Sequence, residues 1–293
     1  MKRKDFLKNT LIGSSLLVVS KSLGNQIHHQ NDEIFEPNPE QIIGFNHIQN
    51  TNSKIMNNMI IHRADSRGSA NHGWLNAKHS FSFANYYNPE RMNFGTLRVL
   101  NDDQIAEGMG FGTHPHDNME IITIPLHGAI EHKDSMGNSS VIKAGEIQVM
   151  SAGTGIQHSE FNHNKDQSLQ LLQIWIFPNK QNVTPRYDQL ALDPTSKQNQ
   201  FTQILSPDPN DAGVWIHQNA WFHLGQFDKD KTSKYQLKDK SNGIYAFVIK
   251  GKFAVENQDL STRDAIGIWN QDQISVKSTS DNAEMLIIEV PMT

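Results

Sequence analysis

The sequence predicts an all-β protein, and three observations lead to that prediction. Short runs of alternating apolar and polar residues recur along the chain, as in strands that are buried on one face. Gly, Pro, Asn and Asp separate these runs at intervals of about ten residues, which is typical of β-sandwiches and β-barrels. Long segments with the 3.6-residue period of a helix do not occur. The 293 residues suffice for one large domain or two ordinary ones.

The composition excludes several classes of function. The chain has no cysteine, which excludes disulfides, thiolate nucleophiles, iron–sulfur clusters and cysteine-based zinc sites. The formal net charge is −5 and the sequence has no basic stripe, so we expect no nucleic-acid partner. The 14 histidines are therefore the notable feature, and any bound metal would have nitrogen and oxygen ligands.

The first segment, residues 1–24, has the layout of an export signal. Basic residues at positions 2–8 precede an apolar run at 11–19 that is too short to span a bilayer as a helix. The run RKDFLK at 3–8 resembles the twin-arginine (Tat) consensus with one arginine replaced by lysine. We therefore expect export to the periplasm and no membrane span. The alternative is the frayed or helical N-terminus of a cytoplasmic protein.

Residues 25–58 are polar, rich in Asn and Gln, and aperiodic. This composition predicts a linker or a poorly ordered tail. His28 and His29 lie in it, and an isolated pair of histidines in such a tail is interpreted as incidental.

From residue 59 onward the sequence predicts strands that form two β-units. Polar residues between 178 and 210 interrupt the pattern, so we place an N-terminal unit at 59–180 and a C-terminal unit at 181–293. The predicted strands are His79–Phe83, Phe94–Leu100, Glu120–Leu126, Ala129–His132, Glu146–Met150, Leu169–Phe177, Val214–His217, Trp221–Phe227, Ile244–Ile249, Ala265–Trp269 and Met285–Val290.

The segment from Gly108 to Glu120 carries the first chemical signal. His114 and His116 are two residues apart, so a strand points both imidazoles to the same face. Pro115 between them cannot donate to a ladder, which suits a strand edge or a barrel mouth. Glu120 shares their parity if the strand runs straight, and a bend would break this relation.

A second signal follows about forty residues later. His158 and Glu160 again occupy positions i and i+2, so an imidazole and a carboxylate share one face. If both strands face one barrel interior, three histidines and one carboxylate converge. That set suits Fe(II), Ni(II), Cu(II), Mn(II) or Zn(II). A single His-x-His often only lines a surface, whereas two such motifs in a strand-rich chain favour a metal site.

These residues resemble a known family. The stretch from Gly108 to Glu120 resembles the first cupin motif, and the segment from Gly155 to Asn162 resembles the end of the second. Residues 59–293 are similar to the pirin family, and to its bacterial branch resembling quercetin 2,3-dioxygenases. The matching runs are WLNAKHSFSFANYYNPERM, GFGTHPHDNMEIITIPLHG, EHKDSMGN and GEIQVMSAGTGIQHSE.

The resemblance implies a bicupin, with two face-to-face β-barrels and one metal in the N-terminal barrel. Its ligands would be His114, His116, His158 and Glu160. The resemblance removes Glu120 from the ligands, which leaves it as a support beside them or as a core residue. The C-terminal barrel would hold no metal, and we interpret its His217 and His223 as structural.

The function that the resemblance implies is a dioxygenase that cleaves a flavonol such as quercetin with O2. Glu160 would be both ligand and catalytic base. The metal would be one divalent transition ion, Fe(II) first, with Ni, Cu, Mn or Zn as alternatives. We expect a monomer acting on a phenol. The candidates for the substrate pocket, each also explicable as barrel core, are Phe83, Phe111, Met119, Met150 and Trp175. The alternatives are a metal-dependent sensor or interaction protein, and a cupin oxygenase acting on another small phenol.

Overall fold

The computed structural model describes residues 58–293, which belong to one compact unit. Strands dominate this part of the chain, and its one helical element is the 3-10 turn η2 (Ala64–Ser66). The all-β prediction is therefore confirmed. The predicted signal-like segment and the linker up to residue 57 lie outside the described residues.

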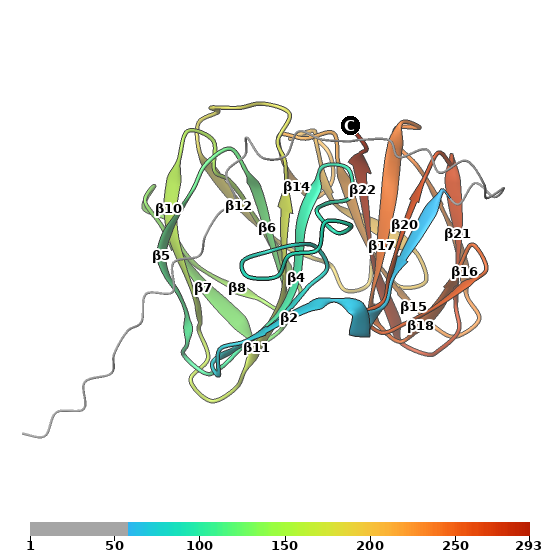
Figure 1. Cartoon of the computed structure of the whole chain (residues 1–293), viewed down its shortest axis with the longest axis horizontal. Helices are drawn as coiled ribbons and strands as arrows, with labels where there is room; N and C mark the ends of the chain where they lie inside the picture. The colour runs from blue at the N-terminus through green and yellow to red at the C-terminus, as the bar shows by residue number, and fades with distance from the viewer. Residues whose placement is uncertain (1–57) are drawn as a thin grey trace, which may run out of the picture. The chain divides into compact units, whose positions relative to one another are not determined.

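Two sheets form the N-terminal barrel (Figure 1). The seven-stranded sheet has the order β12 (Arg186–Ala191), β9 (Glu146–Ser151), β6 (Glu120–His127), β11 (Leu169–Ile176), β4 (Leu97–Ile105), β3 (Leu75–His79) and β2 (Gly68–Asn71). The four-stranded sheet has the order β5 (Gly110–His116), β10 (Ile156–Asn162), β7 (Ala129–Asp134) and β8 (Ser139–Lys143).

The C-terminal barrel repeats this division. Its seven-stranded sheet has the order β1 (Met59–His62), β20 (Ala265–Trp269), β17 (Asn242–Lys250), β22 (Ala283–Pro291), β15 (Trp221–Phe227), β13 (Phe201–Ser206) and β14 (Val214–Trp215). Its four-stranded sheet has the order β16 (Thr232–Gln236), β21 (Gln273–Ser278), β18 (Lys252–Val255) and β19 (Gln258–Ser261).

The two halves exchange strands across the boundary predicted at 180/181. β1 comes first in the described chain but pairs with β20 of the C-terminal barrel, as the blue strand beside β20 in Figure 1 shows. β12 follows the predicted boundary but pairs with β9 of the N-terminal barrel. Each exchanged strand covers a sheet edge that would otherwise present unpaired backbone groups. Sheet membership therefore crosses the boundary in both directions.

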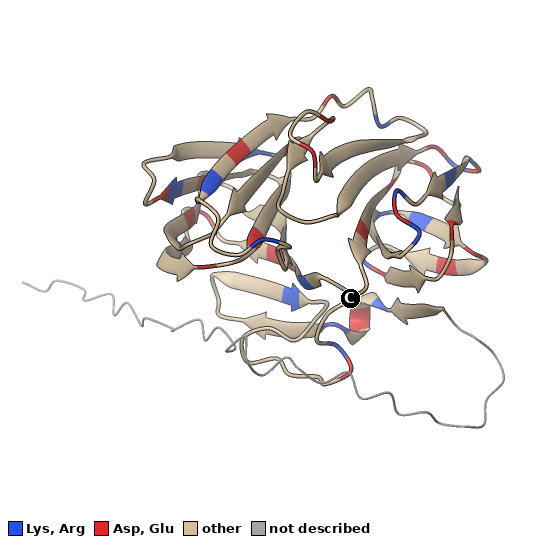
Figure 2. Cartoon of the chain, turned by 90° about the horizontal axis from the view of Figure 1, so that it is seen from above, with Lys and Arg blue, Asp and Glu red and all other residues tan. Residues whose placement is uncertain are grey.

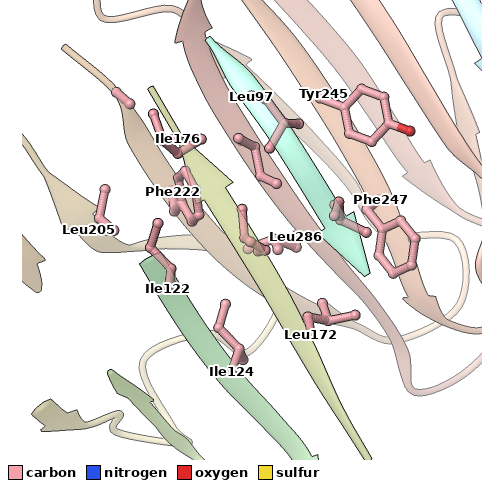
Figure 3. Close-up of a cluster of buried hydrophobic side chains, with 14 of the residues drawn as sticks. Leu97, Ile122, Ile124, Leu172, Ile176, Leu205, Phe222, Tyr245, Phe247 and Leu286 are labelled. Carbon is pink, nitrogen blue, oxygen red and sulfur yellow. The ribbon is translucent and has the colours of Figure 1, made fainter. Parts of the chain in front are cut away.

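The large sheets of the two barrels are buried on both faces. Along β11, Leu172, Ile174 and Ile176 join a cluster that also contains Phe222 and Leu286 of the other barrel (Figure 3). Each fully buried side chain of this size contributes about 1.5–3 kcal/mol by leaving water. The contact between the barrels is thus a hydrophobic core, and one face of β11 remains for the interior of its own barrel.

Inside the N-terminal barrel, a polar row lies between two apolar layers. Cross-strand neighbours Asn101, Gln173 and Thr123 form this row on β4, β11 and β6. The adjacent row toward one end is apolar and contains Val99, Trp175 and Ile121, and a further apolar cluster fills the other end. The C-terminal barrel is instead filled by one continuous apolar cluster. Polar chemistry is therefore concentrated at mid-height in the N-terminal barrel.

Two predicted strands differ from the structure by more than two residues at a bound. The run His79–Phe83 is not a strand, because β3 ends at His79, and the run predicted from Phe94 begins only at Leu97. The alternation of Phe81 and Phe83 arises because Phe81 packs between the barrels while Phe83 packs against the cluster around Trp175. Residues 79–82 are all buried, so the alternation in sequence comes from two aromatic contacts of a loop and not from a strand.

Charged residues of both signs are interspersed over both barrels (Figure 2). Asp102 on β4 accepts from Arg67 at 3.1 Å and from Arg263 of the C-terminal half at 3.0 Å, so an ion-pair cluster joins the barrels beside the apolar contact. Within residues 58–293, no helix has the length and hydropathy that a membrane span requires.

Candidate metal centre

The two predicted motifs lie on neighbouring strands. β5 and β10 are antiparallel, with His158 opposite His114 and Ile156 opposite His116. Along β10, His158 and Glu160 are buried and their neighbours Gln157 and Phe161 are exposed, which is the alternation that a strand imposes. Gly110 permits the close approach of β5, since a Cβ there would lie 2.2 Å from the carbonyl oxygen of Glu160.

Three imidazoles meet at this pair of strands. The ring centroids of His114 and His158 are 4.4 Å apart, and His116 lies 4.9 Å from each of them. One potential ligand atom from each ring lies within 4.8 Å of those of the other two. This spacing brings three nitrogen donors around a point where one ion fits.

The surroundings of His158 and His114 favour ligation. Burial, followed by the neighbouring histidines, lowers the pKa of His158 far below its ordinary value, so its ring is neutral. Its Nε2 is buried without a hydrogen-bond partner among the described residues, an orphaned atom that a metal ion would satisfy. His114 is oriented through Nδ1, which lies 2.8 Å from the carbonyl oxygen of Gly112. A ligand histidine typically holds its second nitrogen in this way.

Glu160 is held by a chain of polar side chains from the opposite sheet. Gln173 Nε2 donates to Oε1 of Glu160 at 3.2 Å and to Oε2 at 3.1 Å. The hydroxyl of Thr123 in turn donates to Oε1 of Gln173 at 2.8 Å. Potential ligand atoms of Glu160, His158 and His132 also lie within 4.8 Å of one another. Two overlapping triads therefore share His158.

His132 on β7 is a member of the site that the sequence reasoning missed. Its Nδ1 lies 3.5 Å from Nδ1 of His158, and its Nε2 lies 3.2 Å from Oδ2 of Asp134. His132 and Asp134 are again at positions i and i+2, within the quoted run EHKDSMGN. This i, i+2 spacing was the feature of the sequence that could have indicated His132 as part of the site.

A second buried carboxyl faces the same interior. Asp103 on β4 is 6% exposed, and burial, then the charges of Asp102 and Glu160, raise its pKa well above the ordinary value. Its Oδ1 has no hydrogen-bond partner among the described residues. Burial thus favours the protonated form of Asp103, which lies close enough to Glu160 for the two carboxyl groups to interact.

The predicted pocket residues fall into two groups. Met150 and Trp175 belong to one buried cluster, and Phe83 and Met119 pack against it. Trp175 connects this cluster to the site, because its ring centroid lies 4.9 Å from that of His116. Phe111 instead packs against the apolar cluster at the other end of the barrel, with Trp74 at 5.2 Å.

Glu120 faces away from the histidines. Its carboxylate accepts from the hydroxyl of Ser151 at 2.7 Å and from the backbone N–H of His217 in the other half. Burial raises its pKa to about 7 despite these bonds and the nearby charge of Arg186. Its expected place beside the ligands is therefore corrected: it supports the contact between the barrels.

The two histidines interpreted as structural lie apart from the N-terminal interior. The ring of His223 on β15 packs 4.8 Å from that of Tyr235, and burial lowers its pKa to about 4. The ring of His217 packs 4.9 Å from that of Trp215.

Two face-to-face barrels, one of them with a cluster of imidazoles and a carboxylate, define a bicupin with a candidate metal centre. The model of the pirin family matches residues 61–176, and that of the quercetinase C-terminal cupin domain matches residues 203–290. The chain belongs to the pirin family.

Similar proteins extend this finding. A quercetin 2,3-dioxygenase of Escherichia coli strain K12 is 44% identical over 231 residues, which are 79% of this chain and 98% of the relative. A pirin-like protein of Caulobacter vibrioides is 39% identical over 77% of this chain and 96% of the relative. The crystal structure of the E. coli pirin YhhW in complex with nickel(II) is 42% identical, with a TM-score of 0.76 over 80% of this chain and 100% of that chain.

Proposed function

We propose that this protein is a metal-dependent dioxygenase that cleaves a flavonol such as quercetin. The observation that carries the proposal is a pair of triads that share His158, one with His114 and His116 and the other with His132 and Glu160. The Nε2 of His158 is buried and has no hydrogen-bond partner among the described residues. The name of the 44% identical relative, a quercetin 2,3-dioxygenase, supports the choice of substrate class.

His114, His116, His158 and Glu160 would hold the ion, for which we propose Fe(II) first. Ni, Cu, Mn and Zn remain compatible with the donor set, and nickel occurs in the YhhW crystal structure. A divalent transition metal held there would supply Lewis acidity toward a phenol oxygen, and a redox-active ion such as Fe(II) would also supply redox access to dioxygen.

Glu160 is the proposed base. A carboxylate oxygen of Glu160 takes the proton of the flavonol 3-hydroxyl, because a flavonolate is the electron-rich form that reacts with O2. Gln173 keeps the carboxylate turned toward the site through its two amide contacts. The reaction consumes one flavonol and one O2, breaks two carbon–carbon bonds of the central ring, and releases one depside and one carbon monoxide.

The side chains around Trp175 form the proposed binding site for a planar phenol. Trp175 and Phe83 pack edge to face at 5.3 Å beside His116, and Met119 packs against the same cluster. The indole Nε1–H of Trp175 is buried without a partner within residues 58–293, so it is available to a phenolic oxygen. Flat apolar surface with a few polar groups is typical of such sites.

Oxygen uptake tests this proposal. The metal-loaded protein is mixed with a panel of flavonols, and consumption of O2 and release of carbon monoxide are measured together. We expect equal amounts of both, and loss of turnover in His114→Ala. The exposed Glu107→Gln serves as control. Oxygen uptake with other phenols but not with flavonols would show that the substrate is another phenol. No uptake with any phenol would favour a metal-dependent interaction protein.

We also propose that the protein acts as a monomer and is exported to the periplasm. The basic-then-apolar order of residues 2–19 supports export. Cell fractionation should place the protein in the periplasm, and replacing Arg3 and Lys4 by Gln should retain it in the cytoplasm. Size-exclusion chromatography with light scattering tests the monomer.

A further inference from the structure

A buried histidine–aspartate pair lies behind His158 on the neighbouring strand. β7 pairs with β10 so that Asp134 is opposite His158 and His132 is opposite Glu160. The side chain of His132 is 1% exposed and that of Asp134 is 0% exposed. Polar groups this deep are costly unless they are hydrogen-bonded, so their bonds define their orientation.

Asp134 fixes the direction of the first bond. Its Oδ1 accepts from the backbone N–H groups of Met136 at 2.9 Å and Asn138 at 3.0 Å, and its Oδ2 accepts from Asn138 Nδ2 at 2.8 Å. A carboxylate among so many donors acts as an acceptor only. The Nε2 of His132, 3.2 Å from Oδ2, must therefore carry a hydrogen.

The tautomer of His132 then determines that of His158. A neutral imidazole with a hydrogen on Nε2 has a lone pair on Nδ1. That Nδ1 lies 3.5 Å from Nδ1 of His158, so His158 must donate across this contact. The hydrogen of His158 is thereby on Nδ1, and the lone pair is on Nε2, the buried atom that has no partner among the described residues.

We propose that His132 and Asp134 are positioning residues for the metal centre, forming a relay from Asp134 through His132 to His158 that presents the Nε2 lone pair of His158 to the ion. This inference rests on the proposed metal site. It assigns His132 to orientation and not to ligation, because turning its Nδ1 to an ion would break its contact with His158. The imidazole ligands are then His114, His116 and His158.

Nitrogen NMR of the histidine side chains tests the relay directly. Long-range proton–nitrogen spectra of the metal-free and the zinc-loaded wild-type protein report which ring nitrogen carries the hydrogen. We expect Nδ1–H on His158 and Nε2–H on His132 in both forms. Nε2–H on metal-free His158, or Nδ1–H on His132, would overturn the relay.

Nickel affinity tests the same relay through variants. His132→Leu removes the acceptor, and Asp134→Asn places an amide donor against Nε2 of His132, which reverses the relay. We expect both to weaken Ni(II) binding by about 10–100-fold, as is usual for partners of ligand histidines. His132→Gln restores an acceptor and should recover most of the affinity. The matched control is His163→Leu, since the side chain of His163 is 49% exposed.

Further outcomes separate this inference from the proposed function. If Ni(II) binds wild type and His158→Ala alike, the metal site itself fails. If binding depends on His158 but His132→Leu binds as tightly as wild type, only the relay fails. A Cu(II) pulsed-EPR spectrum that loses one coordinated imidazole in His132→Leu would make His132 a ligand and would also overturn the relay. If His132→Leu does not fold, the NMR result on the wild type decides.

Discussion

Replacement of Glu120 by Gln should remove a pH-dependent loss of stability. The carboxylate is 1% exposed between the barrels, and burial raises its pKa from 4.5 to about 7. The folded protein therefore holds the proton more tightly than the unfolded chain. Its contribution to stability is fully present below pH 4.5 and is lost as the pH rises to about 7.

The size of this loss follows from the shift. One pKa unit corresponds to about 1.4 kcal/mol, so the shift of Glu120 amounts to about 3 kcal/mol between the two limits. Gln is close in shape to the neutral acid and cannot ionise. Relative to wild type, Glu120→Gln should gain about 3 kcal/mol of unfolding free energy between pH 4.5 and pH 8.

Urea unfolding followed by tryptophan fluorescence measures this difference at a series of pH values. Comparison of wild type with the variant cancels the other groups that titrate in this range, and Glu107→Gln provides the exposed control. A difference between Glu120→Gln and wild type that does not change with pH would refute the reasoning, because it would mean that the folded carboxyl ionises as in water.

Three further changes probe the site and its support. Gly110→Ala should weaken Ni(II) binding, because the new Cβ would collide with the backbone of β10. Gly112→Ala should leave the affinity unchanged, because a Cβ there would have nothing within 4 Å. Equal affinities of the two variants in a nickel titration would contradict this reasoning. Asp102→Ala removes the carboxylate that pairs with the buried Arg67, and it should lower the free energy of unfolding by about 3 kcal/mol. Urea unfolding measures this loss. A loss near zero would show that the ion pair contributes little to stability. Gln173→Leu removes the donor that orients the ligand carboxylate and should weaken Ni(II) binding by about tenfold, and an undiminished affinity would count against that role.

The strand pattern was predictable wherever local alternation decided it. His158 and Glu160 lie two residues apart, and β10 buries both of them. Of the two residues beside Glu160, Ser159 is half-buried and Phe161 is exposed. The family resemblance and the all-β fold of two barrels were confirmed. Both were predictable because they depend on motifs and spacings within short stretches of sequence.

Features that depend on contacts distant in sequence were not predictable. The position of Glu120, beside the ligands or in the core, stayed open because its parity with the histidines holds only along a straight strand. The structure has a turn there: Asn118 has a φ of 42°, and β6 begins in a different sheet from β5. The contact between His132 and His158 depends on the register between β7 and β10, which the spacing of His132 and Asp134 alone does not determine. The exchange of β1 and β12 is likewise a property of sheet assembly.

X-ray absorption at the nickel edge, on protein loaded to saturation, tests the central claim most directly. The arrangement predicts one ion per chain, with three imidazoles and one carboxylate among its ligands, and the loss of one imidazole in each of His114→Ala, His116→Ala and His158→Ala. Nickel that binds with the same spectrum in wild type and in all three variants would contradict the claim that these residues form one metal centre.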